Sequence, residues 1–170
     1  MSDNVNINRR IIMAVIDCDI KLKAALDTIA WSEVTDNGRQ RTNNHGYDVI
    51  VGGTLFESYA DHPRQLIRLN SVLKSTAAGR YQLLSRYWDV YRKQLNLKDF
   101  SPLSQDIVAL QQIRERKAID LFLRGDIENA FTRCNNIWAS LPGAGYGQHE
   151  HKLDNILKTY DQKLKSYVIS

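Results

Sequence analysis

The fold of this chain is decided around one stretch, Ala30-Trp31-Ser32-Glu33-Val34-Thr35-Asp36-Asn37-Gly38. Before it, from about Arg9 to Ser32, apolar residues recur at helical spacing, which predicts one long amphipathic helix or two shorter ones. After it, from Thr35 to Gly46, the composition changes to asparagine, glycine and polar residues, which is typical of a loop. The stretch therefore predicts the C-terminal end of a helix close to Glu33.

A β-hairpin is predicted directly after this loop. It lies in the run Tyr47-Asp48-Val49-Ile50-Val51-Gly52-Gly53-Thr54-Leu55-Phe56, where two β-prone segments flank Gly52-Gly53. Glycine supplies the positive φ that tight hairpin turns need. This run is the one clear strand signal in the sequence.

The remainder of the chain is predicted to be mostly helical. Ser101-Pro102 forms a helix start, because serine caps the first turn and proline fits its first position. Gly125 is a helix stop, and Asp126 is a new N-cap. Helices are expected over residues 9–32, 81–97, 102–123, 126–138 and 150–167. This pattern predicts one helix-dominated α+β domain with a small antiparallel β-hairpin or sheet after the first helix.

Size and composition are those of a single globular domain. A chain of 170 residues can bury roughly two-thirds of its unfolded surface. A net charge of +4 favours anionic polymers such as nucleic acid, acidic lipid or cell-wall material, without choosing among them. Cys18 and Cys134 are too few for a disulfide framework and are interpreted as small buried hydrophobes, although a pair between them stays open.

The N-terminal segment does not fit a secretory signal. Arg9-Arg10 precedes a short apolar run, and Asp17 and Asp19 follow it without a small-residue cleavage site. No stretch approaches the length of a membrane span. The chain is therefore expected to be made in the cytosol and to have no membrane anchor.

The sequence carries no recognisable motif for a metal, a phosphate group or a nucleophile. His149 and His151 stand two residues apart, whereas a zinc-binding helix places its histidines four apart. No Gly-x-Ser-x-Gly elbow appears, and the glycine clusters lack the lysine of a phosphate loop. We expect no metal and no cofactor.

Glu33 is a candidate for proton chemistry. A helix C-terminus carries partial negative charge, and burial beside Trp31 would add desolvation, and both effects raise the pKa of a carboxyl group. A general acid that acts near neutral pH needs such a pKa. The alternative is a solvated glutamate at a helix end, and its position alone leaves both interpretations open.

Five longer motifs lie in order between about Lys23 and Tyr160. They are Trp31-Ser32-Glu33-x-Thr35-Asp36-Asn37-Gly38-Arg39-Gln40, Asn44-His45-Gly46-Tyr47-Asp48-Val49-Ile50-Val51-Gly52-Gly53, Ala78-Gly79-Arg80-Tyr81-Gln82-Leu83-Leu84-Ser85-Arg86, Lys98-Asp99-Phe100-Ser101-Pro102 and Asn136-Ile137-Trp138-Ala139-Ser140-Leu141-Pro142-Gly143-Ala144-Gly145-Tyr146-Gly147-Gln148. Together they resemble the phage lambda endolysin family. The resemblance implies one lysozyme-like domain over residues 1–170, with a catalytic core at 23–160. Residues 1–22 have no close counterpart and are expected to form an N-terminal extension, a polar tail plus an extra helix.

The same resemblance implies a murein lytic transglycosylase and a role in host cell lysis. Such enzymes cut the β-1,4 bond between N-acetylmuramic acid and N-acetylglucosamine and leave a 1,6-anhydromuramic end. The family's catalytic acid falls on Glu33, which would act first as acid and then as base. A hydrolytic muramidase on the same fold, with Asp48 or Asp36 activating water, is the alternative. A wall-binding or nucleic-acid-binding module without activity is a third reading.

Substrate contacts are also implied by the resemblance. Gln82 is expected to contact sugar N-acetyl or hydroxyl groups, and residues 65–74 and 142–151 look like two lips around a glycan strand. The substrate-binding residues expected are Gln82, Tyr146, His45, Tyr47, Asp48 and Tyr81. For each of them a role as turn or hairpin scaffolding is the alternative.

Val34 departs from the family pattern, because the lambda protein has a glycine at this place. A β-branched residue would be strained there if the backbone needs positive φ. Ala77 also replaces a glycine, Tyr87 a tryptophan and His149 a phenylalanine. None of these changes removes the expected acid.

The expected partners are the glycan strands of peptidoglycan, with no nucleic acid. The family relies on a holin, although no direct contact with it is implied. The chain is therefore expected to be made in the host cytoplasm and to act as a monomer in the periplasm after holin-mediated release.

Overall fold

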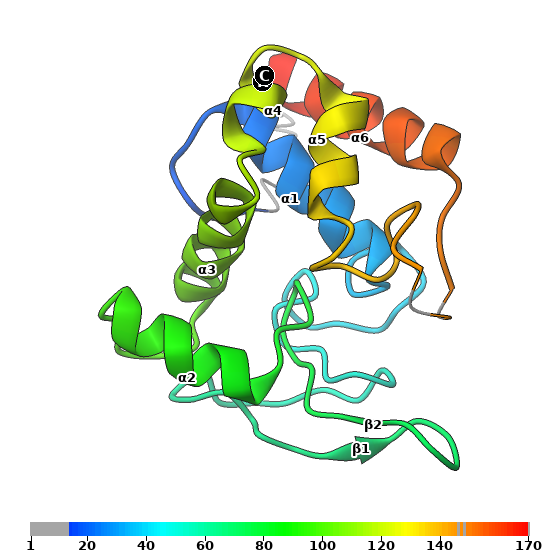
Figure 1. Cartoon of the computed structure of the whole chain (residues 1–170). Helices are drawn as coiled ribbons and strands as arrows, with labels where there is room; N and C mark the ends of the chain where they lie inside the picture. The colour runs from blue at the N-terminus through cyan, green and yellow to red at the C-terminus, as the bar shows by residue number, and fades with distance from the viewer. Residues whose placement is uncertain (1–13, 146, 148, 170) are drawn as a thin grey trace, which may run out of the picture.

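The computed structural model describes residues 14–145, 147 and 149–169 (Figure 1). Its elements are α1 (Ile20–Ser32), β1 (Ile67–Arg68), β2 (Lys74–Ser75), α2 (Ser85–Gln94), α3 (Pro102–Glu115), α4 (Ile119–Leu123), α5 (Ile127–Cys134) and α6 (Leu153–Val168). Helix α1 packs against α3, α4 and α6, whereas α2 and the β1–β2 sheet lie at the opposite end of the molecule. The helix-dominated α+β architecture with a small antiparallel sheet is confirmed.

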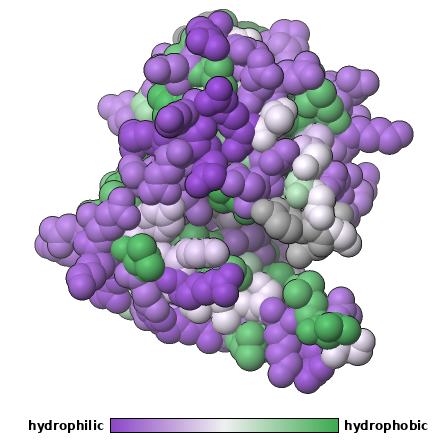
Figure 2. All heavy atoms as spheres, viewed as in Figure 1, coloured by the Kyte–Doolittle hydropathy of each residue, from purple (hydrophilic) through white to green (hydrophobic). Residues whose placement is uncertain are grey.

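Two apolar clusters divide the molecule into two lobes. The larger cluster surrounds α1 and includes the fully buried Leu26 and Phe122. The smaller cluster contains Trp88 and Phe100 and joins α2 to the segments that follow α1. Tyr59 packs against both clusters. The surface is hollowed between the two lobes (Figure 2).

Helix α1 begins directly after Asp19, whose carboxylate caps the first turn by accepting a 2.8 Å hydrogen bond. Residues 14–19 are not helical, and two of their backbone amides donate to the buried Asp106 carboxylate at 2.8 and 3.0 Å. The helix predicted from residue 9 to residue 32 therefore does not include residues 14–19, because two backbone amides of this segment are drawn to a distant acceptor. The rest of the extension lies outside the described residues.

The Gly52-Gly53 turn forms as predicted, and both glycines have positive φ. The strands that flank it are shorter than predicted. Val49 and Leu55 make a single isolated antiparallel bridge, because the adjacent Ile50 pairs with Ala78 instead. The segment is a tight turn that is joined to the smaller lobe by isolated bridges and contributes no regular strand.

The two-stranded sheet lies where the sequence analysis predicted a lip and no strand. Strand β1 (Ile67–Arg68) pairs with β2 (Lys74–Ser75), and the Asn70 side chain closes the turn by accepting the amides of Val72 and Leu73 at 2.9 and 2.8 Å. Strands of two residues show too little alternation to be recognised in a sequence. The hairpin leaves four large apolar side chains exposed: Leu66, Leu69, Val72 and Leu73.

Two predicted helices are shortened by residues that adopt positive φ without being glycine. Lys117 has φ +55° and splits the helix predicted over 102–123 into α3 and α4. Gln82 has φ +53° within a turn that bridges Ala78 to Leu83, so α2 starts later than the predicted 81–97 range. Lysine and glutamine are not residue types that indicate a left-handed backbone in a sequence.

The predicted helix boundaries with local signals are confirmed. The Ser101 hydroxyl accepts the Ser104 amide at the start of α3, and Pro102 occupies its first turn. Gly125 has φ +85° and separates α4 from α5. Helices α5 and α6 correspond to the last two predicted helices, with ends moved by one to four residues.

Two further sequence expectations concern cysteines and the membrane. Cys134 is fully buried and Cys18 is partly buried, and both are free thiols that pack against the larger cluster. None of the helices in the described part of the chain is long and apolar enough to cross a lipid bilayer.

Candidate active site

Glu33 lies at the C-terminal end of α1, as the sequence predicted. Its backbone amide donates to Ile29 O at 2.8 Å, so the residue closes the last turn of the helix. The side chain is partly buried, and Ser140 Oγ donates to Glu33 Oε1 at 2.8 Å. Among the described residues, no Lys, Arg or His forms an ion pair with this carboxyl group.

The surroundings of Glu33 keep its proton near neutral pH. Burial of the carboxyl group raises its pKa from 4.5 to about 7, and hydrogen bonds from Ser140 partly oppose this rise. A carboxyl group with this pKa is present in both protonation states at neutral pH. Glu33 can therefore give a proton and later take one back, which is what an acid–base catalyst must do.

A second side chain ties the C-terminal end of α1 to the segment that carries Ser140. The His151 Nε2–H donates to Ser32 O at 3.2 Å, and the His151 backbone amide donates to Ser140 O at 2.9 Å. The His151 ring packs on Trp31, with 4.4 Å between ring centroids. These contacts fix the position of Ser140 relative to Glu33.

Val34 follows the acid in a left-handed conformation, with φ +61°. Its side chain is about half exposed, so no burial compensates for the strain. A left-handed backbone costs an L-residue about 1–2 kcal/mol, and β-branching adds to the crowding. The sequence analysis raised this possibility at Val34. Ala77, the other replaced glycine, does not have positive φ.

A buried arginine holds the chain on both sides of Glu33. Arg80 is completely buried, and its guanidinium donates to Asp27 Oδ1 at 2.9 Å and to Asp36 Oδ2 at 3.1 Å. The Thr35 hydroxyl donates to Arg80 O at 2.6 Å. One residue within α1 and two just beyond it are thereby anchored to the same point, which leaves Glu33 on a rigid turn.

The other two carboxylates considered for catalysis are engaged in structural contacts. Asp48 is buried and accepts hydrogen bonds from the Thr42 hydroxyl and the Asn43 amide. Asp36 is bound through Oδ2 to Arg80. Both carboxylates therefore already stabilise loops around the site.

Three of the predicted substrate-binding residues contact buried or partly buried carboxylates. Tyr47 and Tyr81 are buried, and their hydroxyl groups donate to Asp106 Oδ1 at 2.8 and 2.6 Å. His45 is partly exposed, with Nδ1 4.0 Å from Asp36 Oδ2 and φ +49°. In this structure both tyrosine hydroxyl groups are therefore bound to a structural carboxylate.

Gln82 lines a cavity that also borders α2, the end of α3 and residues 136–138. Its Nε2 donates to Gly79 O at 2.9 Å and to Val49 O at 3.2 Å, which holds the side chain in one orientation. Tyr146, predicted to border the cleft, lies outside the described residues. The proposed contacts of Gln82 and Tyr146 with substrate remain predictions.

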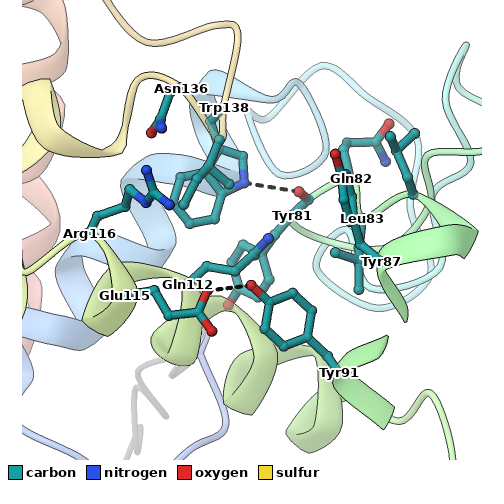
Figure 3. Close-up of a pocket in the computed structure, with 12 residues that line it drawn as sticks. Tyr81, Gln82, Leu83, Tyr87, Tyr91, Gln112, Glu115, Arg116, Asn136 and Trp138 are labelled. Atoms are coloured by element: carbon teal, nitrogen blue, oxygen red, sulfur yellow. Dashed lines mark hydrogen bonds between the residues drawn. The ribbon is translucent and has the colours of Figure 1, made fainter. Parts of the chain in front are cut away.

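A cavity of about 270 Å³ opens beside Gln82 (Figure 3). Its walls come from residues 81–84, α2, the end of α3 and residues 136–138. The Trp138 Nε1–H donates to Tyr81 O at 3.0 Å and joins two of these walls. The side chains not anticipated from sequence include Tyr87, Tyr91, Gln112, Glu115, Arg116 and Asn136.

The two histidines discussed for metal binding do not lie on a helix. His149 and His151 precede α6, and their rings meet edge to face with centroids 4.9 Å apart. Among the described residues, no group of three or more His, Cys, Asp or Glu side chains is arranged to hold a metal ion.

Ser140 was not predicted as a site residue, and His151 was included only as the last residue of the predicted lip 142–151. Ser140 lies 107 residues after Glu33, so no local spacing relates the two. The one available signal was that Ser140 belongs to the motif Asn136-Ile137-Trp138-Ala139-Ser140 singled out by resemblance. A hydroxyl group in a loop near a glycine-rich run is otherwise ordinary.

Comparison with known proteins gives consistent results. The model of the Endolysin family matches residues 23–166. The endolysin of Escherichia phage lambda is 66% identical over 148 residues, which is 87% of this chain and 94% of that protein. The endolysin of Escherichia phage P2 is 51% identical over 158 residues, covering 87% of this chain and 95% of that protein.

Solved structures agree with the sequence matches. Bacteriophage lambda lysozyme complexed with a chitohexasaccharide superposes with a TM-score of 0.86 at 66% identity, covering 87% of this chain and 96% of that one. A second structure of lysozyme from bacteriophage lambda gives a TM-score of 0.82 at 64% identity over the same shares. The lysozyme-like fold predicted from the motifs is thereby confirmed.

Proposed function

The chain belongs to the Endolysin family, and from that membership and the setting of Glu33 we propose that it is a murein lytic transglycosylase. It cleaves the β-1,4 bond between N-acetylmuramic acid and N-acetylglucosamine and so causes host cell lysis. The observation that carries the proposal is a partly buried carboxyl group, with a pKa of about 7, bound by one hydroxyl and by no cation among the described residues.

The reaction needs Glu33 twice. In its protonated state Glu33 donates to the glycosidic oxygen, so that the N-acetylglucosamine side leaves as an alcohol. The resulting carboxylate takes the proton of the muramic 6-hydroxyl while that oxygen forms a bond to C1. The product is a 1,6-anhydromuramic end, no water is added, and Glu33 is protonated again.

Ser140 assists the step in which Glu33 carries charge. Its hydroxyl donates to Oε1, and hydrogen bonds to an ionised acceptor are stronger than those to a neutral one. It therefore stabilises the carboxylate that forms as the glycosidic bond breaks. Burial acts in the opposite direction and favours the protonated form of Glu33. The balance between the two sets the pKa near 7.

The roles of the other acidic residues favour internal cyclisation over hydrolysis. A hydrolytic muramidase that inverts needs a second carboxylate free to activate water. Asp48 is buried with both oxygens bonded, and Asp36 is paired with Arg80. Both carboxylates are thus already engaged in structural contacts, whereas cyclisation through the 6-hydroxyl of the substrate needs only Glu33.

The substrate is the glycan strand of peptidoglycan. A relative that shares 66% of the sequence was solved with a chitohexasaccharide, a β-1,4-linked glycan. The surface hollow between the two lobes is the proposed path of such a strand to Glu33 (Figure 2). Gln82, Tyr146 and His45 remain the proposed contacts, with Asp48, Tyr47 and Tyr81 supporting them from below.

The cellular route and the assembly are further parts of the proposal. Peptidoglycan lies outside the cytoplasmic membrane, so a chain made in the host cytoplasm reaches it after a holin has opened that membrane. The protein acts there as a monomer, and residues 1–170 form one domain whose catalytic core begins at residue 23. Appearance of the protein in the periplasm of cells that express it without a holin would contradict this route.

Product analysis tests the reaction type. Purified murein sacculi are digested in ¹⁸O-water, and the muropeptides are identified by mass spectrometry. The proposal expects anhydro ends that are lighter than hydrolytic ends by one water and contain no ¹⁸O. Reducing muramic ends that carry ¹⁸O would show that the enzyme is a hydrolase.

A further inference from the structure

The cavity beside Gln82 contains groups that the proposed reaction does not use. It lies between α2, the C-terminal end of α3 and residues 136–138 (Figure 3). Its volume of about 270 Å³ is at the lower end of the range for small-ligand sites. Three tyrosines contribute to the lining, and Tyr91 donates to Glu115 Oε2 at 2.6 Å across the floor.

Two opposite charges stand at adjacent positions on the rim of this cavity. Glu115 is the last residue of α3 and Arg116 is its C-cap, and both side chains are exposed. Among the described residues, neither forms an ion pair within 4.0 Å. In Figure 3 the Arg116 guanidinium lies next to Trp138 and Asn136, whereas Glu115 lies next to Tyr91.

The position of Glu115 is unfavourable in the free protein. The C-terminal end of a helix carries partial negative charge, which stabilises a cation such as Arg116 but disfavours a carboxylate. Glu115 is held there by two donors, the Tyr91 hydroxyl at 2.6 Å and Gln111 Nε2 at 3.2 Å. A cation from a ligand would compensate the carboxylate, and a ligand carboxylate would bind the Arg116 guanidinium.

A glycan alone does not match this pair of charges. The amide and hydroxyl groups of an N-acetylated sugar are neutral, so they gain no ionic contact from either residue. Murein differs from a plain glycan because a short peptide is attached to the lactyl group of its muramic acid. That peptide carries carboxylates, which are complementary to Arg116, and an ammonium group, which is complementary to Glu115.

We propose that this cavity binds the stem peptide of murein, with Arg116 holding a peptide carboxylate and Glu115 its ammonium group. The proposal rests on the proposed function, because it specifies the substrate further, as a glycan that carries a peptide. Tyr87 and Tyr91 supply apolar surface for the aliphatic part of the peptide.

The cavity is connected to the candidate acid through one short segment. Asn136, Ile137 and Trp138 form one wall of the cavity, and Ser140, two residues further, donates to Glu33. Gln82 lies on the wall opposite this segment in Figure 3. The proposed binding mode places a muramic residue near Glu33, with its peptide extending past this shared segment toward Arg116.

The test compares two substrates that differ only in the peptide. Intact sacculi and sacculi stripped of stem peptides by an amidase are digested by the wild-type chain, by Arg116→Gln and by Glu115→Gln. Arg133→Gln is the matched control, because Arg133 is an exposed arginine on α5 that does not line the cavity. We expect each rim variant to lower kcat/KM on intact sacculi roughly fivefold and to leave stripped sacculi unchanged.

An equal loss on both substrates would overturn the proposal and make the cavity a glycan subsite. No loss on either substrate would also overturn it. Titration of the free stem tetrapeptide into the wild-type chain and into Arg116→Gln gives a readout that does not depend on activity. Binding of the peptide to the wild type, and weaker binding to the variant, is expected even if the chain cleaves neither substrate. That result would leave peptide recognition intact while refuting the proposed function.

Discussion

Acidic residues that lie within a few positions of each other in this protein have opposite electrostatic surroundings. Asp27 and Asp36 share the buried Arg80 guanidinium, so their charges are compensated by a cation. Glu33, between them in sequence, meets one serine hydroxyl and, among the described residues, no cation. Burial therefore raises the pKa of Glu33 to about 7, while the aspartates remain paired to Arg80.

The difference separates stability from chemistry. An ion pair that is buried and fully hydrogen-bonded holds the chain in one conformation, and breaking it leaves an uncompensated charge. An acid that is buried without a cation stabilises nothing by its charge, but it retains a proton that can be transferred. The Arg80 cluster therefore fixes the turn on which Glu33 reacts.

Replacing the acid should give the largest effect. Glu33→Gln keeps the shape of the side chain but removes its proton transfer, which normally contributes 10²–10⁴-fold to a rate. Because Glu33 acts in both steps, we expect murein lysis to fall by about 10³-fold or more, while binding to sacculi persists. Turbidity loss and sedimentation with sacculi measure the two quantities. Glu128→Gln, an exposed glutamate on α5, is the control.

Glu33→Gln should also change the way in which the stability of the protein depends on pH. The pKa of Glu33 in the folded protein, about 7, lies above the 4.5 of a free glutamate. The folded state therefore binds more protons than the unfolded state between these values, and stability falls as pH rises through this window. Glu33→Gln removes this dependence, so it should gain stability relative to the wild type above pH 7.

Breaking the Arg80 cluster should lower the stability of the protein and leave lysis intact. Asp27→Asn removes one of the two anions that compensate a completely buried guanidinium. We expect the free energy of unfolding to drop by about 3 kcal/mol, with lysis retained at temperatures where the variant is folded. Urea unfolding measures the drop. Asp161→Asn breaks only an exposed pair with Lys165 and should cost less than about 1 kcal/mol.

A smaller effect is expected at Ser140. Ser140→Ala removes the hydroxyl that stabilises the Glu33 carboxylate, so the pKa of Glu33 should rise further. The loss of one hydrogen bond to a developing charge should slow lysis roughly 3- to 10-fold and move its pH profile upward. Ser140→Thr keeps the hydroxyl and should restore both. A profile that does not move in Ser140→Ala would mean that the hydroxyl does not act on Glu33.

The smallest effect concerns the residue after the acid. Val34 adopts φ +61° with a half-exposed, β-branched side chain. Val34→Gly should raise the free energy of unfolding by about 0.5–1 kcal/mol, because relief of strain exceeds the added chain entropy. Val34→Ala keeps a Cβ and should recover only part of this gain. A loss of stability in Val34→Gly would show that the left-handed turn is not strained.

Features with local signals were predictable from the sequence. Glu33 marks a helix end because polar turn residues follow it at once, and Gly125 ends α4 because it adopts positive φ. Lys117 ends α3 by the same conformation, but lysine carries no such signal. Contacts between residues that lie far apart in the sequence could not be predicted either. No spacing relates Ser140 to Glu33, and none shows that Asp106 draws residues 14–19 out of the first helix.

The central claim is that this fold keeps a proton on Glu33 near neutral pH. Glutamate labelled with ¹³C in the side-chain carboxyl group allows a direct titration by NMR, and comparison with Glu33→Gln assigns the resonance. Our account predicts a midpoint near pH 7 for Glu33. A midpoint near 4.5, the value of a free glutamate, would contradict it.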